Sequence, residues 1–132
     1  MPHLKIEYTD NIEAQADMGT LCRGLAQVLG SLKDEQGLPL FPLGGTRVLA
    51  YPAPHHAVAD GGDHAFVYLN LRIAIGRSDA MKTIAGDALL ERAKAHFSSL
   101  FSERTLGITL QIDEGVQVYD GKHSNLHTLF SK

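Results

Sequence analysis

The pattern that most limits the possible folds is a run of alternating apolar and polar residues from Ala65 to Ile75. Apolar side chains stand at every second position of this run, at Val67, Leu69, Leu71, Ile73 and Ile75. A period of two residues is typical of a β-strand that buries one face, and Gly76 then offers a turn. The run predicts a long strand with its apolar face against a core.

A helix and another strand are predicted directly after this strand. Ser78 can cap the helix, with Asp79 in its first turn. The expected apolar face of the helix consists of Met81, Ile84, Ala85, Ala88, Leu89, Ala93, His96, Phe97 and Leu100. Such a face requires a sheet beneath it. The following strand alternates Leu106, Ile108, Leu110 and Ile112, which completes a β-α-β unit.

The first half of the chain has the same order of elements. Leu4, Ile6 and Tyr8 alternate with polar residues and predict a strand that begins almost at residue 2. Asp10 and Asn11 offer capping oxygens for a helix that ends near residues 30–33. Its apolar positions are Ile12, Met18, Leu21, Leu25, Val28, Leu29 and Leu32.

A loop rich in proline and glycine, residues 37–45, leads from this helix to a short strand. The strand is predicted from Arg47 to Tyr51, with Pro52 and Pro54 as its stop. Residues 55–63 are polar and contain glycine, so we expect an exposed turn region there.

These elements predict an α+β fold, a single domain spanning residues 1–132. It consists of two tandem β-α-β units, roughly 1–60 and 61–132, with a four-stranded mixed sheet and two helices on one face. A chain of 132 residues with 44% hydrophobic content can bury one such core. The second face of the sheet lacks a cover, and we expect an apolar face there to meet another subunit in a homo-oligomer.

Composition disfavours several classes of function. Twelve basic and fifteen acidic residues, spread without long runs, leave no basic stripe for nucleic acid. No segment approaches the roughly 20 apolar residues of a membrane-spanning helix, and the opening residues do not read as a signal peptide. Cys22 has no partner for an internal disulfide. A cytoplasmic protein is expected.

A metal site is also considered and disfavoured. His55, His56, Asp60, Asp63 and His64 lie close in sequence. Adjacent histidines point in different directions on a regular element, however, and no H-E-x-x-H or paired-cysteine spacing occurs. A solvated loop explains these residues better, so no metal is expected.

Three residues are candidates for chemistry on an organic acid. Removal of Met1 would leave Pro2 with a secondary amine, and apolar and arginine neighbours would favour its neutral, basic form. Arg77 follows a strand at a helix start, where its guanidinium could hold a carboxylate. Arg47, after Gly44-Gly45, has a weaker case for the same role. For each residue a purely structural role is the alternative.

Short motifs recur in a fixed order and spacing along the chain. They are Met1-Pro-His3, Asp10-Asn-Ile12, Phe41-Pro-Leu-Gly-Gly45, Ala59-Asp-Gly61, Ala65-Phe-Val67, Gly76-Arg-Ser78, His96-Phe97 and Asn125-Leu-His-Thr-Leu-Phe130. Together they resemble the 5-carboxymethyl-2-hydroxymuconate isomerase family of the tautomerase superfamily over nearly the whole chain. Gly76-Arg-Ser-Asp79 also resembles the end of a strand in 4-oxalocrotonate tautomerase.

The resemblance implies a cofactor-independent and metal-independent homotrimer with active sites near subunit boundaries. Pro2 would move a proton from the 2-hydroxyl of a dienol acid to a distant carbon, and Arg77 and Arg47 would bind carboxylates. The first unit has Ile12 near the arginine position and the second has Val67 at the proline position. One active site per protomer is therefore implied.

Two other functions stay open at this point. A trimeric protein could keep the fold and bind a small acid without turnover. A tautomerase relative could also act on another unsaturated carboxylic acid, for example by hydration or dehalogenation.

Overall fold

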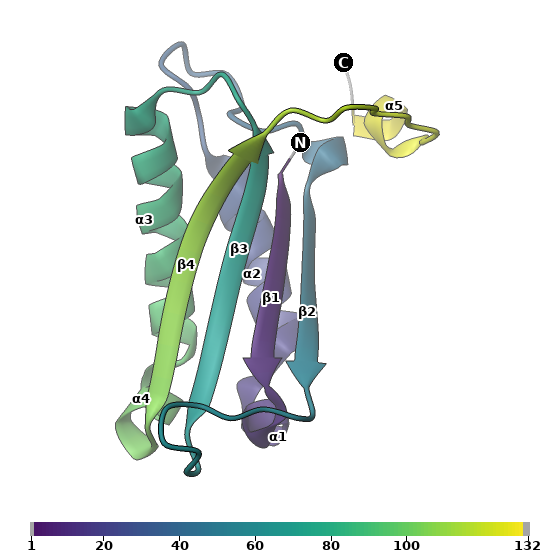
Figure 1. The fold of residues 1–132 in the computed structure, drawn as a ribbon. Helices are drawn as coiled ribbons and strands as arrows, with labels where there is room; N and C mark the ends of the chain where they lie inside the picture. The colour runs from purple at the N-terminus through teal and green to yellow at the C-terminus, as the bar shows by residue number, and fades with distance from the viewer. Residues whose placement is uncertain (1, 131–132) are drawn as a thin grey trace.

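The computed structural model describes residues 2–130 and contains a single four-stranded sheet in these residues (Figure 1). The strands are β1 (His3–Thr9), β2 (Arg47–Ala53), β3 (Ala65–Ala74) and β4 (Leu106–Gly115). Two long helices, α2 (Met18–Ser31) and α3 (Asp79–His96), connect them. The short elements are η1 (Asp10–Ile12), α1 (Glu13–Ala16), η2 (Leu43–Gly45), α4 (Ser98–Glu103) and α5 (Leu126–Phe130).

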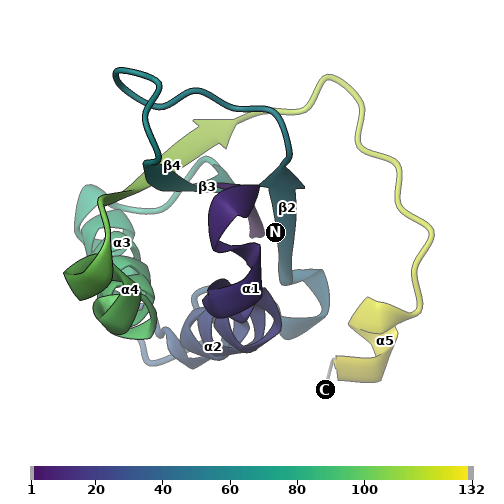
Figure 2. The same ribbon diagram turned by 90° about the horizontal axis from the view of Figure 1, so that it is seen from below.

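The sheet has the order β2-β1-β3-β4 and mixed strand directions. β1 is parallel to β2, and β3 is parallel to β4. The two central strands, β1 and β3, are antiparallel. Helices α2 and α3 lie on the same face of this sheet (Figures 1 and 2). The predicted α+β fold, with two β-α-β units and both helices on one face, is confirmed.

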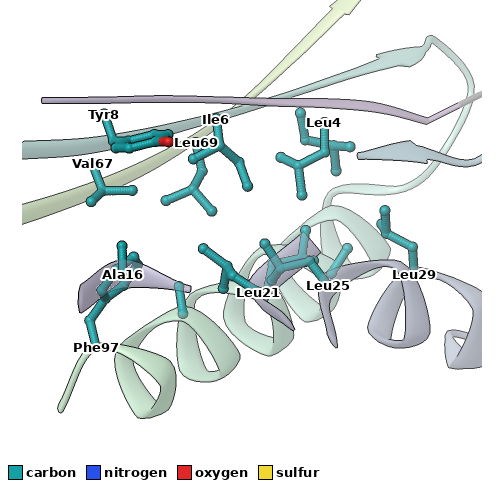
Figure 3. Close-up of a cluster of buried hydrophobic side chains, with 14 of the residues drawn as sticks. Leu4, Ile6, Tyr8, Ala16, Leu21, Leu25, Leu29, Val67, Leu69 and Phe97 are labelled. Atoms are coloured by element: carbon teal, nitrogen blue, oxygen red, sulfur yellow. The ribbon is translucent and has the colours of Figure 1, made fainter. Parts of the chain in front are cut away.

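The core lies between the sheet and α2 and α3. The alternating residues of β1 and β3 face α2, so Leu4, Ile6 and Tyr8 are buried beside Val67, Leu69 and Leu71 (Figure 3). Leu21, Leu25 and Leu29 complete the core from α2. Removing a leucine side chain from such a core costs about 2–5 kcal/mol, so the alternation in the sequence strongly determines which face of each strand is buried.

The first helix does not run as predicted, because Asp17 interrupts it. Asp17 adopts a left-handed conformation with φ of 48°, and its side chain accepts hydrogen bonds from the amide and hydroxyl of Thr20 at the start of α2. The carbonyl of Ala16, at the end of α1, lies 2.5 Å from Nε2 of His96. The expected single helix is therefore wrong in its first turn, while its end near Ser31 is confirmed.

Three other local expectations are corrected. Pro52 lies within β2 and does not stop it, since β2 is an edge strand and such a strand tolerates the missing N–H. Ile75 is 58% exposed because β3 ends at Ala74. Ile84, expected on the buried face of α3, is 48% exposed. The buried residues of α3 are Ala85, Leu89 and Ala93, and its Ser78 cap is confirmed by a bond to the amide of Met81.

The uncovered face of the sheet is largely polar, whereas an apolar face was expected. Tyr68 donates to Gln111 at 2.7 Å, and Asn70 donates to Asp113 at 2.8 Å, across β3 and β4. Apolar exposure on this face is concentrated at β2, where Leu49 is 37% exposed and Tyr51 is 47% exposed. Cross-strand hydrogen bonds satisfy much of this polar surface without a second layer.

Candidate active site

Pro2 is buried directly before β1, at one end of the sheet. Its carbonyl accepts a hydrogen bond from the backbone N–H of Arg47 at 3.2 Å. This bond extends the parallel pairing in which His3 lies opposite Arg47. The start of β2 therefore fixes the position of Pro2, and the structure brings two of the three candidate residues into direct backbone contact.

Arg77 lies at the same end of the sheet because β1 and β3 run in opposite directions. His3 pairs with Arg72 of β3, so the start of β1 adjoins the end of β3, after which Arg77 follows. Pro2 and Arg77 belong to different β-α-β units, yet the central antiparallel pair places both at one end, where β1 starts and β3 ends in Figure 1. We call this the proline end of the sheet.

The guanidinium of Arg77 is held by backbone carbonyls and an aromatic ring. Its Nε and Nη2 donate to the carbonyl of Leu40 at 3.3 and 3.1 Å, and Nη1 donates to Ala74 at 3.4 Å. Its Cζ lies 4.6 Å from the centroid of the Phe41 ring. Partial burial lowers the pKa of Arg77 below its usual value, and Glu114 acts against this shift. An arginine nevertheless stays charged, and two of its five N–H groups remain for a ligand.

Arg47 is half-buried at the start of β2. One of its guanidinium nitrogens donates to the carbonyl of Gly45 at 3.3 Å. The side chain lines a cavity of about 390 Å³ together with His3 and six residues of the C-terminal segment. Arg47 therefore places a cation opposite His3, the residue next to Pro2, where a carboxylate could bind.

Ile12 and Val67, which the resemblance puts where a second arginine and proline would fall, belong to the core. Ile12 and Val67 are both fully buried, at 0% exposure. They lie at the opposite end of the sheet, where β1 ends and β3 begins. A second copy of the proline and arginine pair is therefore absent from the described chain, and its place is occupied by hydrophobic packing.

The sequence interpretation missed the contribution of the C-terminal segment. Helix α5 packs against η2 so closely that a Cβ at Gly44 would lie 2.8 Å from the Cα of His127. His127 lines two cavities, one with Arg47 and the other, of about 420 Å³, with Phe41. His127 lies in the closing motif of the sequence. Its contact with the Gly44-Gly45 motif joins residues about 80 positions apart, so no local sequence pattern predicts it.

Of the aromatic residues Phe41, Phe66, Tyr68 and Tyr119, the structure places Phe41 beside a candidate arginine. Phe41 is buried, stacks with Arg77 and lines the cavity beside His127. Tyr68 instead bonds to Gln111 on the open face, and Phe66 packs against Gly107 there. Tyr119 is 86% exposed. Phe41 is thus the aromatic residue tied to a candidate arginine.

The histidine-rich loop lies at the end of the sheet opposite Pro2. The ring of His64 bridges Thr105 at 2.6 Å and Asp60 at 2.8 Å, and His56 lies 3.5 Å from Asp10. The hydrogen bonds from Gly62 and His64 hold the pKa of Asp60 below its usual value. Within residues 2–130 no three or more histidine, cysteine or acidic side chains form a metal-binding group.

None of the helices in residues 2–130 is long and apolar enough to cross a bilayer. Cys22 is a half-buried free thiol on α2. Burial raises its pKa, with a smaller opposing effect from Arg23, so the thiol is held away from its reactive thiolate form.

Solved structures with low sequence identity share this fold. A fused 4-OT wild-type symmetric trimer has a TM-score of 0.50 at 20% identity, covering 87% of this chain and 91% of that chain. At this identity the likeness concerns the fold alone. The class that the fold defines is an α+β protein with a four-stranded mixed sheet and two helices on one face, as in that trimer.

The particular family follows from much closer matches. The family model for 5-carboxymethyl-2-hydroxymuconate isomerase matches residues 2–130. The 5-carboxymethyl-2-hydroxymuconate Delta-isomerase of Escherichia coli is 34% identical over 131 residues, which is 98% of this chain and 99% of that protein. A crystal structure of a 5-carboxymethyl-2-hydroxymuconate delta-isomerase is 48% identical, with a TM-score of 0.95 over 100% of this chain and 94% of that chain. This chain belongs to the 5-carboxymethyl-2-hydroxymuconate isomerase family and is an isomerase.

Proposed function

We propose that the protein converts a 5-carboxymethyl-2-hydroxymuconate-type dienol acid to its 2-oxo isomer, with Pro2 as the proton carrier. The observation that carries this proposal is the burial of Pro2 at the proline end, bonded through its carbonyl to Arg47. The family match that begins at residue 2 supports the same assignment. The substrate class comes from the names of the similar proteins.

The reaction moves one proton and shifts one conjugated system. The Pro2 amine, freed by removal of Met1, takes the proton of the 2-hydroxyl, and the O–H electrons form the C2 carbonyl. The C2–C3 double bond moves to C3–C4, and the electrons of the C4–C5 double bond take a proton at C5 from the Pro2 ammonium. The amine is thereby regenerated, so neither a redox partner nor a cofactor is needed.

Arg77 and Arg47 would stabilise the anion formed during this transfer. A guanidinium binds a carboxylate through two parallel N–H bonds, and fixed cations near developing charge lower the barrier. The backbone bonds from Arg77 to Leu40 orient its remaining N–H groups before substrate binds. Such preorganisation supports a role in transition-state binding.

We propose that the protein acts as a homotrimer in the cytoplasm. The open face of the sheet has no covering layer in the described chain, which leaves it for subunit contacts. The symmetric trimer with the same fold supports this assembly, and the free Cys22 suits a reducing compartment. The mass in solution, measured by light scattering, tests the assembly, and a monomer or dimer would contradict it.

The decisive experiment measures ultraviolet absorbance during conversion of 5-carboxymethyl-2-hydroxymuconate. It compares protein with Met1 removed, verified by mass, with its Pro2→Ala variant and with protein that retains Met1. We expect rapid conversion by the first alone, because an N-terminal primary amine replaces the proline ring amine in the variant and an acylated nitrogen has no basic lone pair. Equal rates in all three would remove Pro2 from the mechanism.

A folded, trimeric protein without turnover would instead favour a small-acid-binding role. Turnover of a different unsaturated acid would favour another tautomerase reaction.

A further inference from the structure

The chain after β4 wraps around the proline end of the sheet. It leaves β4 on the open side, passes the β2 edge and reaches α5 beside η2 (Figures 1 and 2). None of its residues has a role in the proton transfer proposed above. We call residues 116–130 the C-terminal arm.

A cavity of about 390 Å³ lies between this arm and the starts of β1 and β2. Five of the residues that line it can carry positive charge, namely His3, Arg47, Lys122, His123 and His127. Asp120 is the acidic residue among the described lining residues, and it forms an ion pair with Lys122. Since Arg47 and Lys122 outnumber the single carboxylate and the three imidazoles can donate hydrogen bonds, the cavity is suited to an anionic ligand.

His127 stands between this cavity and the one beside Phe41. The residue lines both, so it connects the Arg47 side of the site with the Phe41 and Arg77 side. Its Nε2 is buried and has no hydrogen-bond partner among the described residues. A buried polar nitrogen of this kind is costly unless a ligand or water satisfies it. The imidazole nitrogen therefore lacks a partner that residues 2–130 could supply, and a ligand could provide one.

The position of His127 is fixed by tight backbone packing. A Cβ at Gly44 would lie 2.8 Å from the His127 Cα and 2.9 Å from the Leu126 carbonyl. Glycine at this position lets α5 approach η2 closely, and this approach sets the His127 backbone against the start of β2. The backbone that carries the His127 imidazole is therefore held in a fixed position.

We propose that His127, with Lys122 and His123, binds the carboxylate on the substituent arm of the substrate. The inference rests on the proposed function, whose substrate class carries three carboxylates, two at the ends of the chain and one on the branch. Arg77 and Arg47 suffice for the two end carboxylates. The C-terminal arm then selects three-carboxylate substrates over two-carboxylate ones.

The test compares two substrates that differ by one carboxylate. Initial rates are measured for 5-carboxymethyl-2-hydroxymuconate and for 2-hydroxymuconate, with wild-type protein, His127→Ala and His127→Gln. Loss of a charge-assisted hydrogen bond predicts a rise in KM of about tenfold or more for the three-carboxylate acid with His127→Ala, partly restored by His127→Gln. We expect values within about twofold of wild type for the two-carboxylate acid. An equal effect on both acids, or on neither, overturns the proposal.

Two surface variants keep the test independent of α5 packing. Lys122→Gln removes a cation and should raise KM for the three-carboxylate acid alone, whereas Asp120→Asn removes the opposing carboxylate and should lower it. His55→Gln, an exposed change at the opposite end of the sheet, is the matched control and should alter neither KM. Shifts of the same sign in Lys122→Gln and Asp120→Asn contradict an anion subsite.

A binding measurement separates this inference from the proposed reaction. Propane-1,2,3-tricarboxylate and pentanedioate are titrated calorimetrically into wild-type protein, in the assembly that it forms in solution, and into His127→Ala. Preference for the tricarboxylate that disappears in His127→Ala supports the subsite even if wild-type protein turns over neither muconate. Turnover of both muconates with no such preference supports the reaction and rejects the subsite.

Discussion

The Arg77 guanidinium stacks on the ring of Phe41, with Cζ 4.6 Å from the ring centroid, while Nε and Nη2 donate to the adjacent carbonyl of Leu40. This pair joins the end of β3 to the loop that precedes β2. The same side chain that is proposed to bind substrate therefore also holds together two segments of the proline end.

Arg77→Lys should lower both activity and stability. A lysine keeps the charge but loses the planar fork that bonds Leu40 and stacks on Phe41. We expect a loss of about tenfold or more in kcat/KM for the muconate substrate and about 1–2 kcal/mol in free energy of unfolding. Rates and urea denaturation measure these effects. Arg23→Lys, on the exposed face of α2, is the control, and an equal loss there would deny Arg77 a special role.

Tyr8→Phe should change how stability responds to alkaline pH. Burial, followed by a hydrogen bond to Glu13, raises the pKa of Tyr8 to about 12. A raised pKa favours the protonated phenol in the folded state. The contribution of Tyr8 to the free energy of unfolding is therefore complete below about pH 10, the pKa of the unfolded state, and is lost between pH 10 and 12. The free energy of unfolding of the wild type should therefore fall more steeply over this window than that of Tyr8→Phe. The exposed change Tyr51→Phe is the control, and its free energy of unfolding should depend on pH as that of the wild type does. If Tyr8→Phe also showed the same pH dependence as the wild type, the shifted pKa would be contradicted.

Gly44→Ala should displace α5 from η2. The added Cβ would lie 2.8 Å from the Cα of His127, and backbone cannot yield as a flexible side chain can. We expect a loss of about 1–3 kcal/mol in free energy of unfolding and faster amide hydrogen exchange in residues 126–130. Gly30→Ala is the matched control, because its Cβ meets only the Leu43 side chain at 3.8 Å and helix propensity favours alanine. Unchanged exchange in Gly44→Ala would show that α5 does not depend on this contact.

Cys22 should react slowly with a disulfide reagent in the folded protein. Burial raises its pKa, and the thiolate is the reactive form. Labelling with a chromogenic disulfide at pH 8 is expected to be at least about tenfold slower than in urea-unfolded protein. The Cys22→Ser variant gives the background. Labelling as fast in the folded as in the unfolded protein would contradict a protected thiol.

The local periodicity of the sequence determined much of the fold. Alternation at Leu4, Ile6 and Tyr8, and again from Val67 to Ile73, marks strands whose inner face is buried. Ser78 caps α3 as its position predicts. These features depend on neighbours within a few residues, where hydrophobic burial and hydrogen-bond geometry have a fixed period.

Contacts between residues distant in sequence decided the structural features that local patterns could not predict. His96 reaches Ala16 across 80 residues at the break before α2, and Ile84 falls outside the core because of how α3 sits on the sheet. Pairing along the sheet also settled that its second face is mostly polar.

The sequence by itself determined the strand and helix order, the buried faces and the identity of Pro2, Arg47 and Arg77 as candidates. Only the tertiary structure decided that they share one end of the sheet, since this follows from the antiparallel pairing of β1 with β3. It alone also brought His127 to that end through its contact with Gly44. The physical reason is that side-chain period is set by local backbone geometry, whereas strand pairing and helix docking minimise the free energy of the whole chain.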